Sequence, residues 1–289
     1  MKGDGASSVD GGGSSAVSSS SADVERGPGG PHRLLAVALP ALPEVQAGDD
    51  LAALAAAAWR QLAAAEPELA PRPGDVLVVT QKIVSKAEGA VVDLRGVEPR
   101  PEALAFARQW DRDPRQVEVV LREAAAVVRM ERGVLIARTR HGFVCANAGV
   151  DASNVAPHTV TLLPRDPDAS ARALRATLAD HLGLAAADAP AVLISDSFGR
   201  PWRWGIVDVA LGLAGFGPLD DQRGRPDTSG RPMRSTIVAV ADEIASAAEL
   251  AAGKTSGRPL VLVRGATLPA GEGSIVADMV MPPAADLFP

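Results

Sequence analysis

Residues 75–80, with the sequence Asp-Val-Leu-Val-Val-Thr, form a short apolar run that follows a Pro- and Gly-containing connection. Because the central residues do not alternate with polar ones, this run predicts a β-strand that is buried on both faces. Further apolar runs predict strands at residues 34–39, 133–139, 143–146, 160–163, 191–194, 235–240 and 259–264. Helical patterns lie between them, at residues 51–65, 102–110, 114–128, 168–182 and 241–252. This mixture of strands and helices predicts a mixed α/β fold.

The composition is typical of a globular protein. The chain has 289 residues, of which 47% are hydrophobic, and this share is sufficient to fill a core. A net charge of −6 and an aromatic share of 3% argue against a nucleic-acid surface. The single cysteine, Cys145, excludes an intramolecular disulfide and suits a reducing compartment. We predict a cytoplasmic protein, because no apolar run could span a membrane and no apolar segment follows Lys2 as in a signal peptide.

The first 31 residues differ from the rest of the chain. They consist mostly of Gly, Ser, Ala and Asp, without a periodic apolar pattern. Such a segment cannot bury enough surface to offset the entropy lost on ordering. We therefore predict a disordered tail at residues 1–31 and a single domain at residues 32–289.

A polar stretch follows the apolar run at 191–194. Ser195, Asp196 and Ser197 come directly after that run, and a Gly-Arg-Pro turn that contains Arg200 comes next. In sheet proteins with helices, ligands bind where strands end and polar loops begin. A carboxylate, a hydroxyl and a guanidinium at such a place suit a phosphate that is bound with a metal ion. The alternative is that Asp196 and Ser197 only cap a turn.

A second polar loop, at residues 147–154, carries Asp151 among small residues. Asp151 and Asp196 would each follow a strand, so we expect them to meet at one edge of the sheet. Two carboxylates and a hydroxyl suit Mg²⁺ or Mn²⁺, which prefer oxygen ligands and share them with phosphates. Lys82, Lys86 and Arg200 are candidate partners for phosphate oxygens, although solvated surface positions would explain both lysines. The pattern favours a metal-dependent enzyme with a phosphorylated ligand, and a binding protein with the same site would share it.

Residues 253–255, Gly-Lys-Thr, resemble the end of a P-loop. Ala248 stands where the first glycine of that motif would be, and a predicted helix precedes the motif while a predicted strand follows it. The P-loop has the opposite order, with the strand first. We therefore exclude a P-loop nucleotide site.

Five motifs occur in the same order as in a known enzyme family. They are GDVLVVTQKIVSKAEGAVVDL at 74–94, NAGVDASN at 147–154, ISDSFGRPWRWG at 194–205, GRPDTSGR at 224–231 and ADEIASAAEL at 241–250. In these motifs the chain resembles the coenzyme F-420:L-glutamate ligase (F-420-0:gamma-glutamyl ligase) family, in its stand-alone form without a C-terminal reductase domain. The resemblance extends from Leu34 to about Ile275.

The resemblance implies a mixed α/β fold that is neither a P-loop nor an ATP-grasp fold, in an intertwined homodimer. It implies a ligase that uses GTP and Mg²⁺ or Mn²⁺, with K⁺ as a further candidate cofactor. The reaction that it implies adds L-glutamate, through γ-linkages, to the deazaflavin precursor of coenzyme F-420. The implied route is phosphorylation of the precursor carboxylate by GTP, followed by attack of the glutamate amine on the acyl phosphate. A non-catalytic nucleotide-binding regulator and a metal-dependent phosphohydrolase are the alternatives.

The resemblance also implies roles for individual residues. Nucleotide-contacting positions of the family fall on Leu42, Pro43, Glu44, Val45, Gln81, Lys82, Lys86 and Asn154. Metal ligands fall on Asp151, Asp196 and Ser197, the last at a position where archaeal relatives carry Thr, and we expect Asp151, Asp196 and Arg200 to carry catalysis. Lys254 departs from the family, because some relatives have a Glu there that binds a second metal ion. We expect Gly253 and Lys254 to contact the nucleotide phosphates instead.

Overall fold

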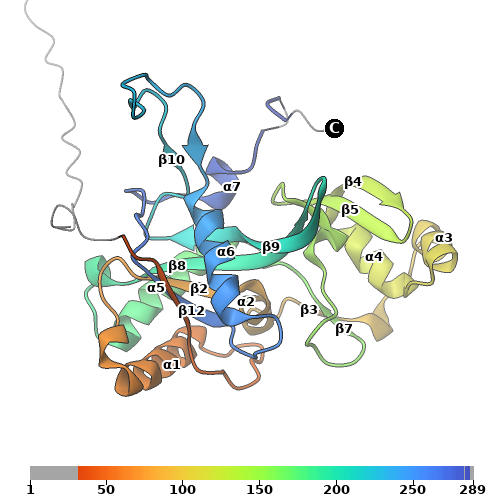
Figure 1. Ribbon diagram of the computed structural model, residues 1–289. Helices are drawn as coiled ribbons and strands as arrows, with labels where there is room; N and C mark the ends of the chain where they lie inside the picture. The colour runs from red at the N-terminus through yellow and green to blue at the C-terminus, as the bar shows by residue number, and fades with distance from the viewer. Residues whose placement is uncertain (1–31, 283, 287–289) are drawn as a thin grey trace, which may run out of the picture. The chain divides into compact units, whose positions relative to one another are not determined.

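A five-stranded mixed sheet organises the domain, with the strand order β1-β12-β2-β8-β9 (Figure 1). The structure is a computed structural model that describes residues 32–282 and 284–286, so the tail predicted at 1–31 lies outside the described residues. The strands of the sheet are β1 (Leu35–Ala38), β2 (Val76–Thr80), β8 (Ala191–Arg200), β9 (Arg203–Ala214) and β12 (Leu260–Arg264). β2 and β8 pair in parallel, whereas every other pair of neighbours in this sheet is antiparallel. The predicted mixed α/β class is confirmed.

Helices cover this sheet and bury its middle strand. α5 (Pro167–Leu182) packs on β8 and β9, and α1 (Leu51–Ala65) packs against α5. α6 (Val240–Ala252) contacts β1, β9 and β12 and crosses the front of the sheet in Figure 1. The apolar residues 76–79 of β2 are all buried, which confirms the prediction for the first apolar run.

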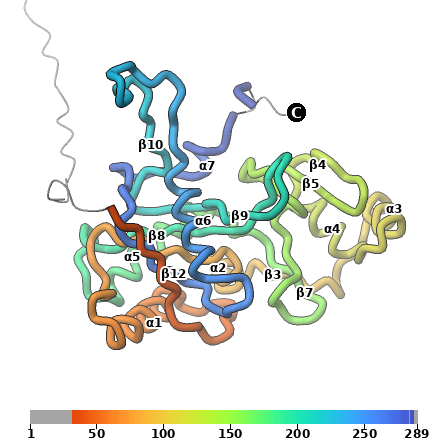
Figure 2. Tube along the Cα trace, viewed as in Figure 1, coloured from red at the N-terminus to blue at the C-terminus, as the bar shows by residue number. Residues whose placement is uncertain are grey.

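A second, smaller core lies beside the sheet. It is formed by α3 (Pro101–Trp110), α4 (Pro114–Glu123), a three-stranded sheet of β4 (Ala124–Glu131), β5 (Val134–Thr139) and β6 (Val144–Ala146), and the pair β3 (Val91–Asp93) and β7 (Thr159–Thr161). The yellow and light-green parts of the trace in Figure 2 mark this region. The remaining elements are α2 (Gln81–Ala87), α7 (Ile275–Asp278), the pair β10 (Asp220–Asp221) and β11 (Ile237–Val238), and short 3-10 helices at residues 67–69, 94–96, 147–149 and 186–188.

The strand predicted at 235–240 is shorter in the structure, where only β11 (Ile237–Val238) is a strand and Val240 begins α6. Two further predicted elements end far from their predicted bounds. The helix predicted at 114–128 is wrong beyond Glu123, because residues 124–131 form β4 and pair with β5. Two adjacent valines, Val127 and Val128, fit a strand better than a helix interior, since their branched side chains lose rotamer freedom in a helix.

The strand predicted at 191–194 is too short. β8 continues to Arg200, because β9 pairs with it along that whole length and provides hydrogen-bond partners for its polar half. Asp196 and Ser197 therefore lie within a strand, and their predicted placement in a loop after a strand is wrong.

A buried ion pair joins β12 to the residue that precedes its antiparallel neighbour β2. Arg264 Nε donates to Asp75 Oδ1 at 2.6 Å and Nη2 donates to Asp75 Oδ2 at 2.7 Å, and both residues are buried. The same guanidinium donates to the carbonyl oxygens of Glu68 and Ala70. This bidentate contact fixes β12 against the start of β2. Among the described residues, no helix has the length and apolar character needed to cross a membrane.

Candidate functional site

The β8–β9 hairpin presents different side chains on its two faces. In the middle of the hairpin Asp196 lies opposite Val209, and Ser197 lies opposite Asp208. Directly opposed residues point to the same face, and successive residues point to opposite faces. Asp196 and Val209 therefore share one face, whereas Ser197 and Asp208 share the other.

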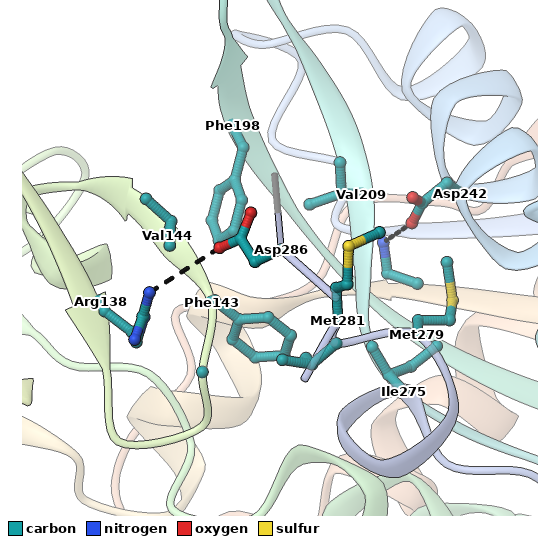
Figure 3. A pocket seen from close by; sticks show the side chains of 13 residues that line it. Arg138, Phe143, Val144, Phe198, Val209, Asp242, Ile275, Met279, Met281 and Asp286 are labelled. Carbon is teal, nitrogen blue, oxygen red and sulfur yellow. Dashed lines mark hydrogen bonds and ion pairs between the residues drawn. The ribbon is translucent and has the colours of Figure 1, made fainter. Parts of the chain in front are cut away.

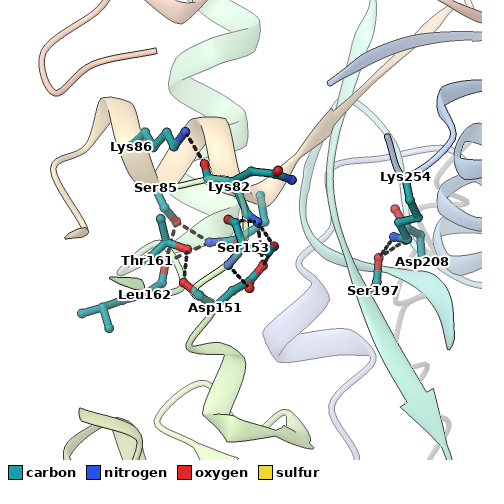
Figure 4. Close-up of polar contacts among 12 residues, drawn as sticks. Lys82, Ser85, Lys86, Asp151, Ser153, Thr161, Leu162, Ser197, Asp208 and Lys254 are labelled. Atoms are coloured by element: carbon teal, nitrogen blue, oxygen red, sulfur yellow. Dashed lines mark hydrogen bonds and ion pairs between the residues drawn. The ribbon is translucent and has the colours of Figure 1, made fainter. Parts of the chain in front are cut away.

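Lys82, Asp151 and Ser153 form a compact cluster, which we call the Lys82–Asp151 group (Figure 4). Lys82 Nζ donates to Asp151 Oδ2, to Ser153 O and to Ser153 Oγ, each at 2.6 Å. Ser153 in turn donates to the Asp151 carboxylate through its backbone N–H and its hydroxyl. Burial acts to raise the pKa of Asp151, but the hydrogen bonds from Lys82 and Ser153 outweigh it and lower that pKa.

Two elements place this group. Lys82 belongs to the first turn of α2, directly after β2, and Asp151 forms an isolated antiparallel bridge with Thr161 at the end of β7. The polar segment after β2 is thus a short helix, and its two lysines both point toward the 151–154 loop (Figure 4).

Asp196 lies close enough to the Lys82–Asp151 group to interact with it electrostatically. Burial raises the pKa of Asp196 to about 7, and the carboxylates of Asp208 and Asp151 contribute to the rise, while Lys82 opposes it. The two predicted metal carboxylates therefore lie near enough to repel each other, although no hydrogen bond links them in the part of the chain that the structure describes. A cation beside them would offset their mutual repulsion.

Three of the predicted nucleotide positions meet at Lys86. Its Nζ donates to Glu44 Oε1 at 2.5 Å and to the carbonyl oxygen of Asn154 at 2.8 Å. In the same N-terminal loop Val45 is buried and Leu42 packs on the core, which leaves Pro43 and Glu44 as its exposed members. The loop and the end of the 147–154 segment thus lie on either side of the Lys86 ammonium.

Gln81 and Arg200, two other predicted site residues, bind backbone carbonyl oxygens rather than the side chains of the candidate site. The Gln81 side chain is buried, and its Nε2 donates to the carbonyl oxygen of Leu162 at 2.8 Å. Arg200 lies at the end of β8, where its Nη2 donates to the carbonyl oxygen of Trp204 at 3.3 Å. Within residues 32–282 and 284–286, Arg200 makes no hydrogen bond or ion pair with Asp151 or Asp196. The proposed roles of Gln81 and Arg200 stay predictions.

A second cluster, the Lys254–Asp208 group, occupies the other face of the hairpin. Ser195 and Ser197 donate their hydroxyls to the Asp208 carboxylate, at 3.1 Å and 2.5 Å. Lys254 Nζ lies 3.3 Å from Asp208 Oδ1, donates to Ser197 Oγ and lies 3.2 Å from Glu249 Oε1 (Figure 4). Burial acts to lower the pKa of Lys254, but Asp208 and Glu249 outweigh it and raise that pKa.

Sequence reasoning missed Asp208, although it is buried at the centre of this group. The available signal was its position, a single acidic residue in the otherwise apolar run Ile-Val-Asp-Val-Ala of residues 206–210. A charged residue in such a run is expected to be paired, since burial of an isolated carboxylate is costly. Gly253 ends α6 immediately before Lys254, and β12 follows, which confirms that the order of elements is not that of a P-loop.

The donor set on this side of the sheet is made of oxygen atoms, as Mg²⁺ and Mn²⁺ prefer. Within residues 32–282 and 284–286, no three His, Cys, Asp or Glu side chains converge as a ready metal cluster. Asp151 and Asp196 could still fit such an ion, because Mg²⁺ is commonly held by one or two carboxylates together with substrate phosphates. The feature that favours a cation there is the donor set, since the Asp151 carboxylate is 44% exposed and able to accept a second partner.

These features define a mixed α/β protein that gathers acidic and basic side chains beside one hairpin of its central sheet. Residues 41–265 match the model of the family described as F420-0:Gamma-glutamyl ligase. The chain therefore belongs to the F420-0:gamma-glutamyl ligase family, as its motifs predicted.

Relatives with the same activity in their names support this assignment. The chain is 45% identical over 225 residues to the coenzyme F420:L-glutamate ligase of Methanothermobacter thermautotrophicus, which covers 78% of this chain and 86% of that protein. It is 46% identical over 223 residues to the protein of that name from Methanopyrus kandleri, covering 77% and 83% of the two chains. It is 40% identical over 216 residues to that of Methanocaldococcus jannaschii, covering 74% and 84%.

Proposed function

We propose that this protein is a GDP-forming ligase that adds L-glutamate, γ-linked, to the deazaflavin precursor of coenzyme F-420. Family membership and the names of its relatives support the ligase and its substrates. The observation that carries the proposal is the convergence of Asp151, Lys82 and Lys86 on one side of α2, with Asp196 nearby. Acidic and basic groups at such spacing suit the transfer of a phosphoryl group.

The proposed reaction has two steps. A carboxylate oxygen of the precursor attacks the γ-phosphorus of GTP, and the bond from that phosphorus to the bridging oxygen breaks, which releases GDP. The amine nitrogen of L-glutamate then attacks the acyl carbon, inorganic phosphate leaves, and the nitrogen loses a proton to give the amide. Neither step needs an oxidant or a reductant.

The two lysines of α2 would bind the phosphates of GTP. Lys82 and Lys86 now pair with Asp151 and Glu44, and each ammonium would exchange that carboxylate for phosphate oxygens when the nucleotide binds. Asp151 and Asp196 would hold Mg²⁺ or Mn²⁺, and the ion would stabilise the charge of the transferred phosphoryl group. The Ser197 hydroxyl, predicted as a third ligand, lies on the opposite face of the hairpin and donates to Asp208 instead. Gly253 and Lys254 would contact the phosphates from the C-terminal end of α6.

We also propose that two copies of the chain form a homodimer. Four valines of the small sheet, Val127, Val128, Val134 and Val144, are exposed, and Trp204 near the tip of the β8–β9 hairpin is fully exposed. Exposed apolar side chains on all three strands of one small sheet suit a contact with a second copy of the chain. Measurement of the molar mass in solution by light scattering tests this proposal, and a monomer at micromolar concentration would contradict it.

The decisive experiment incubates the protein with GTP, Mn²⁺, K⁺, L-glutamate and the coenzyme precursor, and resolves the products by mass. We expect a precursor that carries added glutamate, together with stoichiometric GDP and phosphate. Release of phosphate without glutamate in the product would favour a phosphohydrolase. Nucleotide binding without turnover would favour a regulator.

A further inference from the structure

A cavity of about 420 Å³ opens next to the Asp196 face of the hairpin (Figure 3). Its walls come from the β5–β6 connection, from β8 and β9, and from residues 275–281 and Asp286 near the C-terminal end. The apolar side chains that line it include Phe143, Phe198, Val209, Ile275, Met279 and Met281. Its volume and lining are those of a site for a small, largely apolar molecule.

Two aromatic rings and two methionine side chains line this cavity. Phe143 and Phe198 meet edge to face, with ring centroids 6.3 Å apart and an interplanar angle of 70°. His141 stacks on Phe143 at 5.7 Å, which fixes the orientation of that ring. Met279 and Met281 add adaptable, polarisable side chains on another wall (Figure 3). Such walls favour a flat aromatic ligand, because aromatic rings and thioethers both pack well on an aromatic face.

Polar groups lie toward two ends of the cavity. Arg138, 3.9 Å from Asp286, is at the left in Figure 3, and Asp242 is at the right. Asp242 accepts a hydrogen bond from the backbone N–H of Ala210 at 2.9 Å. A guanidinium and a carboxylate at opposite ends could bind the polar edges of a ring whose faces contact the apolar walls.

The cavity adjoins the candidate site along β8. Phe198 lies two residues after Asp196 and therefore on the same face of the strand, about 7 Å farther along. Val209, which lines the cavity, is the residue directly opposite Asp196. One wall of the cavity, at Val209, therefore lies directly across the hairpin from Asp196.

We propose that this cavity binds the aromatic ring system of the acceptor substrate, so that the part of the substrate that bears the reacting carboxylate extends toward Asp196. The inference rests on the proposed function, which supplies a deazaflavin ring as the acceptor. It assigns acceptor recognition to Phe143, Phe198 and the C-terminal methionines, and it leaves the nucleotide to the lysines of α2 and to Gly253 and Lys254.

The test uses the deazaflavin ring without its carboxylate-bearing part as the probe, and follows binding to the full chain by fluorescence titration. We expect the dissociation constant to rise about tenfold or more in Phe198→Leu and a few-fold in Met281→Ala, since each removes part of a ring contact. Leu250→Ala is the matched control, because Leu250 is an exposed apolar side chain of α6 that does not line the cavity. Thermal melting of each variant shows whether it is folded.

A second measurement separates this inference from the proposed function. In the ligase assay, Phe198→Leu should raise KM for the precursor and leave KM for GTP unchanged. If the wild type forms the glutamylated product but the probe does not bind, or binds both cavity variants as tightly as the wild type, the cavity assignment is overturned while the function stands. If the wild type gives no product but Phe198→Leu still weakens the probe, the function fails and the aromatic site stands.

Discussion

The Lys82–Asp151 group and the Lys254–Asp208 group contain the same types of side chain but differ in which of them is exposed to solvent. Each pairs a lysine with an aspartate and a serine hydroxyl. In the first, the Lys82 side chain is 19% exposed and that of Asp151 is 44% exposed. In the second, the Lys254 side chain is 50% exposed and that of Asp208 is 6% exposed. One group therefore offers solvent a carboxylate, and the other offers an ammonium.

This difference separates the roles that the two aspartates can have. In the proposed function Asp151 would exchange Lys82 for a metal ion, because its carboxylate is partly exposed and interacts with that of Asp196. Asp208 accepts hydrogen bonds from Ser195 and Ser197 through its two carboxylate oxygens, and replacement of the carboxylate by an amide would leave one of these hydroxyls without its acceptor. We expect the first aspartate to matter for activity and the second for stability.

The largest expected effect is on catalysis. Asp151→Asn and Asp196→Asn should each lower the rate of glutamate addition about 100-fold or more, because each removes a charge that the transferred phosphoryl group requires. Their melting temperatures should stay close to that of the wild type. Product formation at saturating Mn²⁺, followed by mass, measures the effect. Asp180→Asn, at an exposed residue of α5, is the control, and a wild-type rate in either site variant would falsify the metal assignment.

The next effect is on stability. Asp208→Asn should lower the free energy of unfolding by about 2 kcal/mol, because the hydroxyls of Ser195 and Ser197 lose a carboxylate that accepts from both of them. Asp151→Asn should change the same quantity far less. Urea denaturation of the two variants under identical conditions compares them directly. If Asp208→Asn and Asp151→Asn have the same free energy of unfolding, the deeper burial of Asp208 does not make it more important for stability.

Glu118, a buried acid outside both groups, provides a test of whether a buried, hydrogen-bonded carboxylate stabilises the fold, because its contribution depends on pH. Burial acts to raise the pKa of Glu118, but hydrogen bonds from Arg100 and Arg122 outweigh it and hold the pKa at about 2, below its ordinary value of 4.5. Since the folded-state pKa is the lower one, the stabilisation is complete above about pH 5 and disappears as the pH falls toward 2. Glu118→Gln should therefore melt well below the wild type at pH 7, and the gap should narrow steadily on acidification. A gap that is constant from pH 7 to pH 3 would contradict this pairing.

The smallest effect concerns the exposed ammonium of the second group. Lys254→Ala should raise KM for GTP a few-fold, because it removes one cation that could contact the phosphates. Lys254→Glu should recover activity only at higher metal concentration. Titrations of GTP and Mn²⁺ against the three proteins measure both effects, with Arg258→Ala as a control at a nearby exposed residue. If the KM for GTP is unchanged in Lys254→Ala, Lys254 does not contact the nucleotide and serves only to hold Ser197, Asp208 and Glu249 together.

The elements that the sequence predicted well are those with a strong local pattern. The helix at 51–65 has the predicted bounds, because Asp50 caps it and an Ala- and Leu-rich stretch continues without interruption to Ala65. The strands at 76–79 and 260–264 were also predictable, since an uninterrupted apolar run of this length indicates a strand that is buried on both faces.

The elements that local pattern missed depend on distant partners. The polar half of β8 is a strand only because β9 pairs with it, and β4 is a strand only because β5 does. The same reason explains why Asp208 was overlooked, since its partners Ser195 and Lys254 come from other elements. Asp151, Asp196, Lys82 and Lys86 could be singled out as a site because each stands in a polar segment that follows an apolar run.

The order of strands in the central sheet has a consequence for the nascent chain on the ribosome. β12, near the C-terminal end of the described residues, lies between β1 and β2, two strands that are made early. Until residues 260–264 have left the exit tunnel, β1 has no neighbour in this sheet and Asp75 lacks its buried arginine. Synthesis would therefore leave an apolar strand edge uncovered for most of its duration, and such edges are where chaperones act and where aggregation begins. A ribosome-arrested chain that stops before β12 should be far more sensitive to protease than one in which β12 has emerged.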